Sequence, residues 1–199
     1  LLDRFLLQME YRNIPTVIGF NKCDLTETGR IRELEEAYGR SGYPLIFVSV
    51  REEQGLENLK AMLAGKTTAL AGPSGAGKSS LMNWLLPEAE METGAVSEKI
   101  KRGRHTTRHS ELFHLGEGTY LFDTPGFSSL YLADFTDETL KLYFREFSDF
   151  EDECRFTGCN HINEPDCGIK KALEDGKISR VRYEHYVQMY QELKEHRRY

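Results

Sequence analysis

Gly72-Pro73-Ser74-Gly75-Ala76-Gly77-Lys78-Ser79 is the stretch that decides the fold of this protein. It matches the phosphate-binding pattern Gly-x4-Gly-Lys-Ser/Thr without a mismatch. Residues 67–71 before it are typical of a short β-strand, and residues 80–86 after it place apolar side chains at helical spacing. Glycines let the backbone wrap closely around phosphate oxygens, and the following helix adds its positive end. These flanks disfavour an incidental glycine-rich turn, so we predict a nucleotide phosphate site.

Two side chains of this loop have predicted roles in phosphate chemistry. Lys78 is expected to reach the β- and γ-phosphates as a catalytic residue, and the Ser79 hydroxyl to bind Mg2+. The residues here that we expect to contact the nucleotide are Gly72, Pro73, Ser74, Gly75, Ala76, Gly77, Lys78, Ser79 and Ser80.

The composition is that of a soluble globular protein with room for one medium domain and a small appendage. Of the 199 residues, 39% are hydrophobic and 29% charged, and no apolar run approaches the roughly 18 residues of a membrane span. A net charge of −6 argues against a uniformly basic nucleic-acid binder. Local basic clusters are expected to be solvated surface: Lys99, Lys101, Arg102, Arg104 and Arg108, and then Arg180, Arg182, Lys194, Arg197 and Arg198.

The strand-like residues 16–20 lead into Asn21-Lys22-Cys23-Asp24, which fits the guanine-reading motif Asn-Lys-x-Asp of GTPases. An aspartate here accepts hydrogen bonds from guanine N1–H and the 2-amino group, and adenine offers neither donor in that arrangement. A buried site that the wrong base leaves unpaired discriminates strongly. Alone, these four residues fit a polar loop equally well. Beside the phosphate loop they predict GTP, with Asn21, Lys22 and Asp24 as contacts, and disfavour a P-loop kinase acting on small molecules.

A further base contact is expected after the strand-like residues 44–48. Ser49-Val50-Arg51 stands where GTPases place a Ser-Ala-x turn whose backbone contacts guanine O6. Val50 replaces the usual alanine, a change that a backbone contact tolerates. Ser49 and Val50 are therefore predicted nucleotide contacts.

Two strands at 110–115 and 119–122, joined by Gly116-Glu117-Gly118, are expected to form a hairpin. The second strand ends in Asp123-Thr124-Pro125-Gly126, an Asp-x-x-Gly motif. Asp123 is expected to hold Mg2+ through water, and the Gly126 N–H to contact the γ-phosphate.

Residues 89–104 are polar and without a clear period, and we expect a long mobile loop that ends in a switch segment. Thr106 or Thr107 is expected to bind Mg2+ and sense the γ-phosphate, with Thr107 slightly preferred over Thr106. This switch role is favoured over a β-turn that is merely rich in polar residues. Phe127 stands where a catalytic Gln normally follows Asp-x-x-Gly, and it cannot orient water. His105 is the candidate to orient the water in place of that Gln. The alternative is that His105 is an ordinary exposed histidine.

These motifs come in an unusual order. A conventional GTPase begins with the phosphate loop, whereas here the two guanine motifs precede it, which indicates a circular permutation. Helical spacing predicts helices at 1–12, 30–40 and 55–63. A strand that should precede the first helix is not found, so we expect the native protein to continue upstream of Leu1.

The C-terminal part carries a concentrated set of metal ligands. After an apolar helical pattern at 135–150 comes Cys154-x4-Cys159-x-His161-x5-Cys167. Cys3His is a closed tetrahedral zinc set, structural rather than catalytic, and it is favoured over unrelated buried thiols. The remaining residues 169–172 and 181–199 are expected to be helical, with three tyrosines that favour packing over RNA stacking: Tyr183, Tyr186 and Tyr190.

The permuted order together with the Cys-x4-Cys-x-His-x5-Cys set closely resembles the RsgA (YjeQ) family of small-subunit-dependent GTPases over essentially all 199 residues. The fold class implied is α/β: a circularly permuted P-loop GTPase domain, three-layer with a mostly parallel sheet, at 1–134, then a small helical zinc-binding domain at 135–199.

The resemblance implies a cytoplasmic GTPase that hydrolyses GTP to GDP and acts late in small (30S) ribosomal subunit maturation. Its implied partners are GTP or GDP, the small subunit and its 16S rRNA, with no membrane, as a monomer. Implied cofactors are one structural Zn2+ and Mg2+. Members usually carry an N-terminal OB-fold, and we expect any such domain here to belong to the part of the protein upstream of Leu1. The chief alternative is an rRNA-binding checkpoint module in which nucleotide state controls docking and hydrolysis only times release.

Overall fold

The computed structural model describes residues 1–86, 112–124, 126–127 and 129–196. The expected mobile loop, the basic cluster at 99–108 and the switch residues His105, Thr106 and Thr107 lie outside these ranges.

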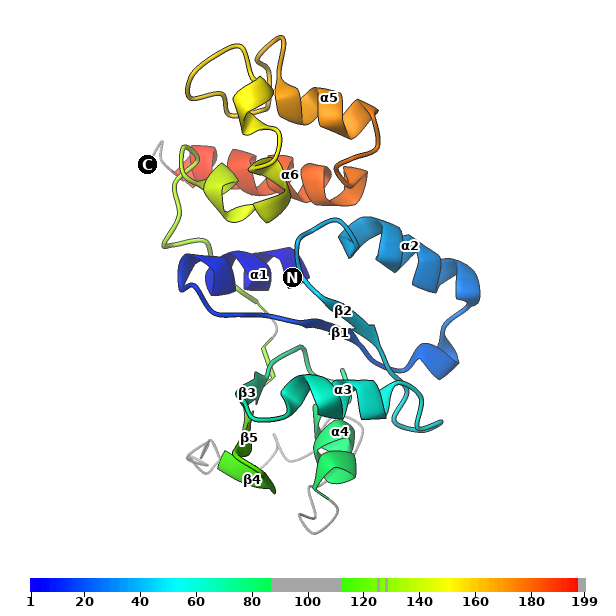
Figure 1. The fold of residues 1–199 in the computed structure, drawn as a ribbon. Helices are drawn as coiled ribbons and strands as arrows, with labels where there is room; N and C mark the ends of the chain where they lie inside the picture. The colour runs from blue at the N-terminus through cyan, green and yellow to red at the C-terminus, as the bar shows by residue number, and fades with distance from the viewer. Residues whose placement is uncertain (87–111, 125, 128, 197–199) are drawn as a thin grey trace, which may run out of the picture. The chain divides into compact units, whose positions relative to one another are not determined.

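Apart from the segment 135–150, the helices and strands of the described residues lie where the sequence predicts them and in the predicted order (Figure 1). Their bounds are α1 Leu2–Tyr11, β1 Ile18–Phe20, α2 Thr28–Tyr38, β2 Leu45–Phe47, α3 Leu56–Leu63, β3 Thr67–Leu70, α4 Lys78–Leu85, β4 Leu112–Gly116, β5 Thr119–Asp123, α5 Gly168–Glu174 and α6 Arg180–His196. Short 3-10 helices are η1 Cys23–Leu25, η3 Leu140–Tyr143, η4 Arg145–Phe147 and η5 Glu151–Glu153.

The segment 135–150 differs from its helical pattern. It forms the separate 3-10 turns η3 and η4 rather than one α-helix, because Phe144 adopts an extended conformation between them (φ −103°, ψ 92°). The break leaves Leu140, Phe144 and Phe147 all buried in the same apolar cluster. Tertiary packing thus overrides a local periodicity that is compatible with a continuous helix.

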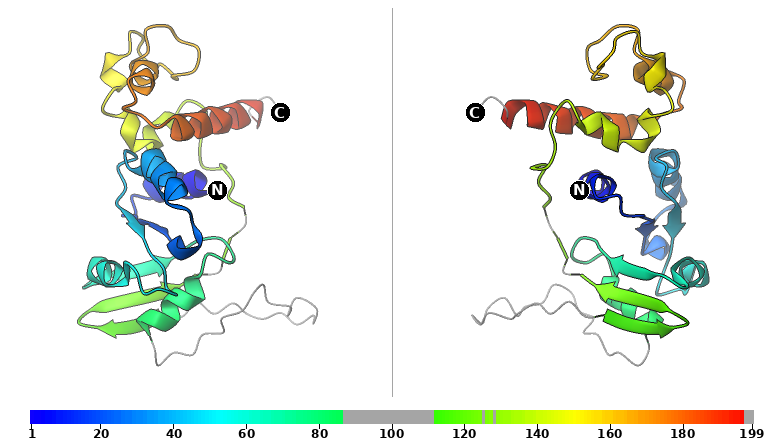
Figure 2. Two further views of the ribbon diagram at one scale, coloured as in Figure 1. Left: turned by 90° about the vertical axis from the view of Figure 1, so that its right-hand side faces the viewer. Right: turned by 60° about the vertical axis from the view of Figure 1, so that its left-hand side comes forward.

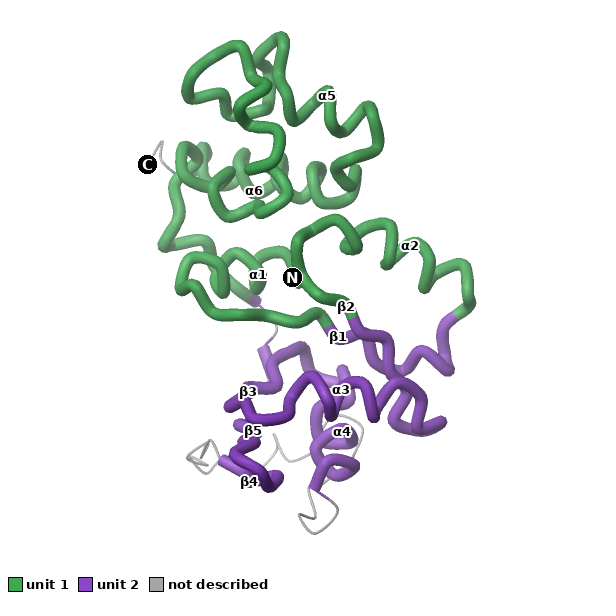
Figure 3. The backbone as a smooth tube through the Cα atoms, viewed as in Figure 1, with its two compact units in different colours: residues 1–18, 27–45, 130–199 green, residues 19–26, 46–129 purple. Residues whose placement is uncertain are grey.

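The chain divides into two compact units (Figure 3). Unit 1 comprises residues 1–18, 27–45 and 130–199, and unit 2 comprises residues 19–26 and 46–129. Helices α1 and α2 therefore belong to the same unit as the C-terminal part of the chain. The boundary at 134/135 between a GTPase domain and a zinc-binding domain stays a prediction.

Unit 2 is built on a three-stranded sheet in the order β3-β5-β4. Strands β3 and β5 run parallel, with Leu70 opposite Asp123, and β4 pairs antiparallel with β5 as the predicted hairpin (Figure 2). The phosphate loop follows β3 and Asp-x-x-Gly follows β5. Because carboxyl ends of parallel strands share one edge of a sheet, the register brings these two motifs together.

In the part of the chain that the structure describes, a second sheet consists of β1 and β2. The Ile18 N–H donates a hydrogen bond to the Pro44 carbonyl at 2.9 Å, and the Val48 N–H donates one to the Phe20 carbonyl at 2.8 Å. Among the described residues no strand ladder joins this sheet to the first. The expectation of a strand upstream of Leu1 stays a prediction.

Unit 1 has a core of apolar side chains from α1, the 3-10 turns, α5 and α6. Tyr186 and Tyr190 are buried in it, which confirms packing for these two tyrosines, and Tyr183 packs at its margin. No helix among the described residues is both long enough and apolar enough to span a membrane.

Arg182 corrects the expectation that the C-terminal cations are solvated. It is 1% exposed, donating from Nε and Nη2 to Glu146 at 2.7 and 3.0 Å and from Nη1 to Asp3. Asp3 also receives the Tyr38 hydroxyl at 3.3 Å and contacts His185. The two carboxylates raise the pKa of Arg182 by more than burial lowers it, so the guanidinium stays charged. Helical periodicity places residue 182 but not its partners, which come from distant parts of the chain.

Candidate functional site

The backbone of the phosphate loop depends on two glycines. Gly75 and Gly77 adopt left-handed conformations, with φ of +78° and +90°. A Cβ atom on Gly77 would lie 2.3 Å from Nδ2 of Asn21. Residue 77 therefore favours glycine for its dihedral angle, and a side chain there would displace the Asn21 amide from its place against the loop.

Lys78 is folded back on its own loop. Its Nζ donates to the carbonyls of Gly72 at 2.8 Å and Pro73 at 3.0 Å. The ammonium thus lies at the mouth of the turn, where the pattern predicted that a phosphate binds. Ser79 and Ser80 follow in the first turn of α4 and are half-buried.

The guanine motif contacts the phosphate loop directly. Asn21 Nδ2 donates to the Ala76 carbonyl at 3.0 Å, and Lys22 Nζ donates to the Gly75 carbonyl at 2.7 Å. Two motifs separated by about 50 residues therefore form one site within unit 2. Its motif residues were predictable from the sequence, but these hydrogen bonds were not.

Ser49 has a side-chain role that the sequence reading missed. Its Oγ donates to the Asp24 carboxylate at 2.6 Å and accepts the Glu52 N–H at 3.1 Å. Ser49 is fully buried, whereas Asp24 is exposed. The serine hydroxyl thus orients the carboxylate predicted to read guanine. The neighbouring Val50 packs its side chain against the core of unit 2.

Asp123 and Gly126 lie beside the phosphate loop. Asp123 is the last residue of β5, and the Thr124 hydroxyl bonds the Leu70 carbonyl at 2.6 Å, which anchors the start of the Asp-x-x-Gly turn to β3. A Cβ on Gly126 would lie 3.3 Å from both Lys78 Nζ and the Ser74 N. The described members of the predicted nucleotide site thus gather in unit 2; the switch threonines and His105 lie outside the described residues.

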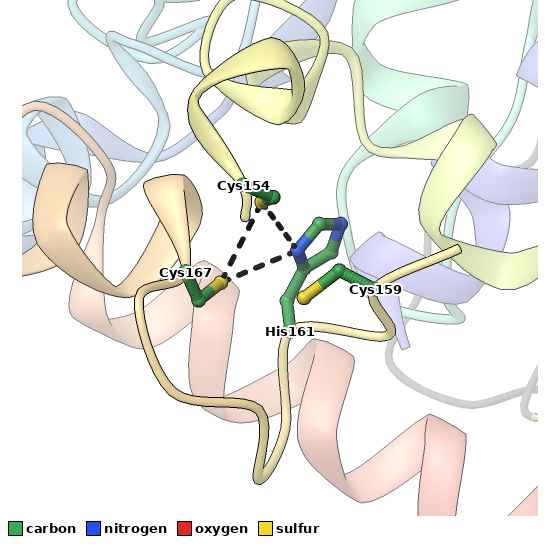
Figure 4. Close-up of side chains that lie close together, drawn as sticks. All are labelled: Cys154, Cys159, His161 and Cys167. Carbon is green, nitrogen blue, oxygen red and sulfur yellow. Dashed lines mark hydrogen bonds between the residues drawn. The ribbon is translucent and has the colours of Figure 1, made fainter. Parts of the chain in front are cut away.

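The four predicted zinc ligands converge in unit 1 (Figure 4). Their ligand atoms all lie within 4.8 Å of one another, and the cysteines are free thiols. His161 Nδ1 lies 3.6 Å from Cys154 Sγ and 3.4 Å from Cys167 Sγ, and these two sulfurs are 3.9 Å apart. Tetrahedral zinc, with bonds of about 2.3 Å to sulfur and about 2.0 Å to nitrogen, separates such atoms by about 3.5–3.8 Å. The donor set and its spacing therefore fit zinc.

Burial dominates the electrostatics of this candidate metal centre. It raises the pKa of Cys159 to about 12 and raises that of Cys167, so both thiols hold their protons at neutral pH without metal. Burial, followed by the charge of Lys141, lowers the pKa of His161 to about 4. The imidazole is therefore neutral and able to bind a metal.

Glu164 organises the loop that carries the ligands. Its carboxylate accepts the backbone N–H groups of Asn160 and Ile162 at 3.0 Å and of Asn163 at 3.1 Å. Burial raises the pKa of Glu164, but these donors outweigh it, so the pKa lies below its usual range. Tyr183 donates its hydroxyl to the His161 carbonyl at 2.6 Å. The only sequence signal for this role was an acidic residue inside the ligand run, and Asp166 shares that feature without the role, since it pairs with Arg155 instead.

Comparison with known proteins agrees with the permuted motif order. The sequence model of the RsgA GTPase matches residues 1–133. The chain belongs to the RsgA GTPase family. An RsgA protein described as a small ribosomal subunit biogenesis GTPase, from Agathobacter rectalis, is 51% identical over all 199 residues, and one of the same description from Alkaliphilus metalliredigens is 48% identical. This chain spans 66% and 68% of their lengths.

Solved structures of similar proteins support the fold. The crystal structure of YjeQ from Thermotoga maritima matches 96% of this chain at 41% identity with a TM-score of 0.80. That of YloQ, described as a circularly permuted GTPase, matches 98% at 36% identity with a TM-score of 0.77. This RsgA family chain covers 64% and 63% of those two proteins. The predicted circularly permuted α/β GTPase fold is therefore confirmed.

Proposed function

We propose that this chain binds GTP with Mg2+ and hydrolyses it to GDP and phosphate. The observation that supports this best is the contact between the guanine motif and the phosphate loop, through Asn21 to Ala76 and Lys22 to Gly75. A loop that holds phosphates and a loop that reads guanine then act on one nucleotide. Asp24, oriented by Ser49, would accept the guanine N1–H and 2-amino group.

The residues around the phosphate loop suit in-line attack by water. Lys78 would exchange its two carbonyl partners for the β- and γ-phosphates, and the loop N–H groups would hold the phosphate oxygens. The side chains proposed to hold Mg2+ are Ser79, Thr107 and, through water, Asp123. When bound, Mg2+ would supply positive charge that offsets the charge developing on the phosphate oxygens. Gly126, next to Lys78, would donate its N–H to the γ-phosphate.

Phe127 limits what the chain does alone. Its side chain has no polar atom, and it stands where a water-orienting Gln is usual. We therefore propose slow intrinsic hydrolysis and help from His105 or from a partner. The partner proposed is the small ribosomal subunit with its 16S rRNA, because the relatives carry the description small ribosomal subunit biogenesis GTPase. We further propose that the protein is a cytoplasmic monomer and that it acts late in 30S maturation.

The C-terminal cluster would hold one structural zinc ion. All four ligand positions are filled by protein atoms, which leaves no open position for substrate. Because the metal would join η5, the ligand loop and the start of α5, its binding contributes to the folding of this part of unit 1.

Measurement of GTP hydrolysis with and without small subunits tests this function. We expect slow turnover alone, stimulation by subunits, and loss of both with Lys78→Ala. His105→Ala should reduce the stimulated rate; an unchanged rate would remove His105 from the mechanism. Preference for ATP over GTP in a binding assay would refute the guanine assignment.

The absence of a polar side chain at Phe127 also favours the second candidate, an rRNA-binding checkpoint module. In that case the bound nucleotide controls docking to the subunit, and hydrolysis only times release. The rate of association with the subunit should then be the same with GTP and with a non-hydrolysable analogue, and only dissociation should be slower with the analogue. A hydrolysis rate unaffected by subunits would favour a simple enzyme instead.

A further inference from the structure

One ring nitrogen of the buried histidine in the metal centre has no hydrogen-bond partner among the described residues. His161 is 0% exposed, and its Nε2 is unpaired. Figure 4 shows Nδ1 facing the sulfurs of Cys154 and Cys167 and Nε2 on the far side of the ring. A histidine that binds metal through Nδ1 carries its proton on Nε2. Metal binding at Nδ1 therefore requires a buried N–H donor for which an acceptor is needed.

Glu151 is the carboxylate placed to accept this proton. Its Oε1 lies 4.0 Å from His161 Nε2, about 1 Å beyond a hydrogen bond. The Glu151 side chain is 36% exposed, so a small rotation can close the remaining distance. The imidazole is less free to move, because the Phe147 ring meets it edge-on with centroids 5.6 Å apart.

Lys141 connects Glu151 to a second ligand residue. Its Nζ contacts Glu151 Oε1 and donates to the Cys159 carbonyl at 3.0 Å, and its side chain is only 11% exposed. Three thiolates, one neutral imidazole and a divalent cation sum to one negative charge. A nearly buried ammonium beside such a centre reduces the electrostatic cost of burying that charge.

We propose that Glu151 and Lys141 are positioning residues for the metal: Glu151 accepts the His161 Nε2–H in the metal-loaded protein, and Lys141 holds Glu151 and the Cys159 carbonyl in place. The proposal rests on the proposed zinc binding. The carboxylate selects the tautomer whose Nδ1 lone pair faces the sulfurs and makes that nitrogen a stronger donor to metal. Loss of such a partner typically lowers metal affinity about 10–100-fold.

Zinc affinity, measured on the whole chain by competition with a chromophoric chelator, tests the proposal. We expect Glu151→Ala to weaken zinc binding by about 10–100-fold, Glu151→Gln by less because its amide oxygen still accepts, and Lys141→Met by about tenfold. Glu153→Gln is the matched control, because Glu153 lies on the same 3-10 helix and its carboxylate forms an exposed 3.7 Å pair with Lys171. It should bind zinc like the wild type.

A spectroscopic readout separates positioning from general loss of structure. In the zinc-loaded wild type, two-bond 1H–15N correlation should show His161 with metal on Nδ1 and a slowly exchanging proton on Nε2. In Glu151→Ala that proton should exchange rapidly while the backbone spectrum of the remaining chain is kept. Equal zinc affinities for Glu151→Ala and Glu153→Gln, or an unchanged Nε2–H signal, would overturn this proposal alone. A wild-type chain that binds no zinc would overturn the metal assignment and this proposal together.

Discussion

At the scale of single residues, the proposed guanine recognition depends on the orientation of Asp24. Ser49→Ala removes the hydroxyl that donates to this carboxylate and that also receives the Glu52 N–H. A hydrogen bond to a charged group contributes about 1.5–3 kcal/mol, so GTP affinity should fall by about tenfold or more. Titration with a fluorescent guanine nucleotide measures this affinity. Ser148→Ala is the control, because Ser148 belongs to unit 1 and not to the proposed nucleotide site. Equal affinities of the two variants would show that Asp24 needs no such partner.

The thiols of the candidate metal centre predict how the proposed zinc binding depends on pH. Burial raises the pKa of Cys159 to about 12 and raises that of Cys167, whereas zinc binds thiolates. Binding at neutral pH therefore expels these protons, and affinity should rise by about tenfold per pH unit for each, until the pH passes the raised pKa values. It falls as the pH is lowered. His161, with its pKa lowered to about 4, adds no proton release near neutrality.

Calorimetry in two buffers of different ionisation enthalpy measures the number of protons released. The same titration with Cys159→Ser, whose hydroxyl holds its proton throughout, should show lower affinity and less proton release. Zinc binding with no proton release at pH 7 would contradict the assignment of these thiols as ligands.

At the scale of elements, the turn between β3 and α4 needs glycine for two separable reasons. Gly77 and Gly65 both have positive φ, +90° and +69°, but only at Gly77 would a Cβ meet another group, Asn21 Nδ2 at 2.3 Å. Alanine at either position should cost about 1–2 kcal/mol of stability from the dihedral angle alone. Only Gly77→Ala should also displace the Asn21 amide from the Ala76 carbonyl and so weaken the contact between the guanine motif and the phosphate loop.

The expected result is therefore a similar loss of unfolding free energy in both variants, with at least a tenfold loss of nucleotide affinity in Gly77→Ala only. Denaturant unfolding and nucleotide titration provide the two measurements. Equal nucleotide affinity in the two variants would show that contact between the loops is dispensable.

At the scale of the whole molecule, the buried Arg182 joins parts of unit 1 that are far apart in sequence. Arg182→Leu would leave the carboxylates of Asp3 and Glu146 buried without their shared cation. Removing one partner of a buried ion pair lowers the free energy of unfolding by about 3–5 kcal/mol. Arg182 also lies over the Phe144 ring, 4.6 Å from its centroid, so part of the loss is packing.

Arg180→Leu is the matched control, because Arg180 is exposed and two residues earlier on α6. It should change the free energy of unfolding by about 0.5 kcal/mol or less. Thermal or denaturant unfolding of both variants compares them. A loss in Arg182→Leu no larger than in Arg180→Leu would mean that the two carboxylates find other partners.

The elements of this fold could be predicted well where local chemistry defines them. The phosphate loop, the strand before it and the helix after it follow from glycine and apolar spacing, and the hairpin β4–β5 follows from Gly116-Glu117-Gly118. The segment 135–150 could not, since its short turns result from burying Phe144 and Phe147 in one cluster. Side-chain partners such as Ser49 for Asp24 could not be predicted either, because they join residues about 25 positions apart.

By itself, the sequence determined the motif order, the permuted fold and the four candidate metal ligands, because each is a local pattern with a local physical cause. Only the tertiary structure decided which side chains orient those residues: Ser49 on Asp24, Asn21 against the phosphate loop, Glu151 near His161, and Arg182 between two acids. The reason is that a hydrogen bond or ion pair depends on separations of a few ångström, and chain folding, not sequence distance, sets them.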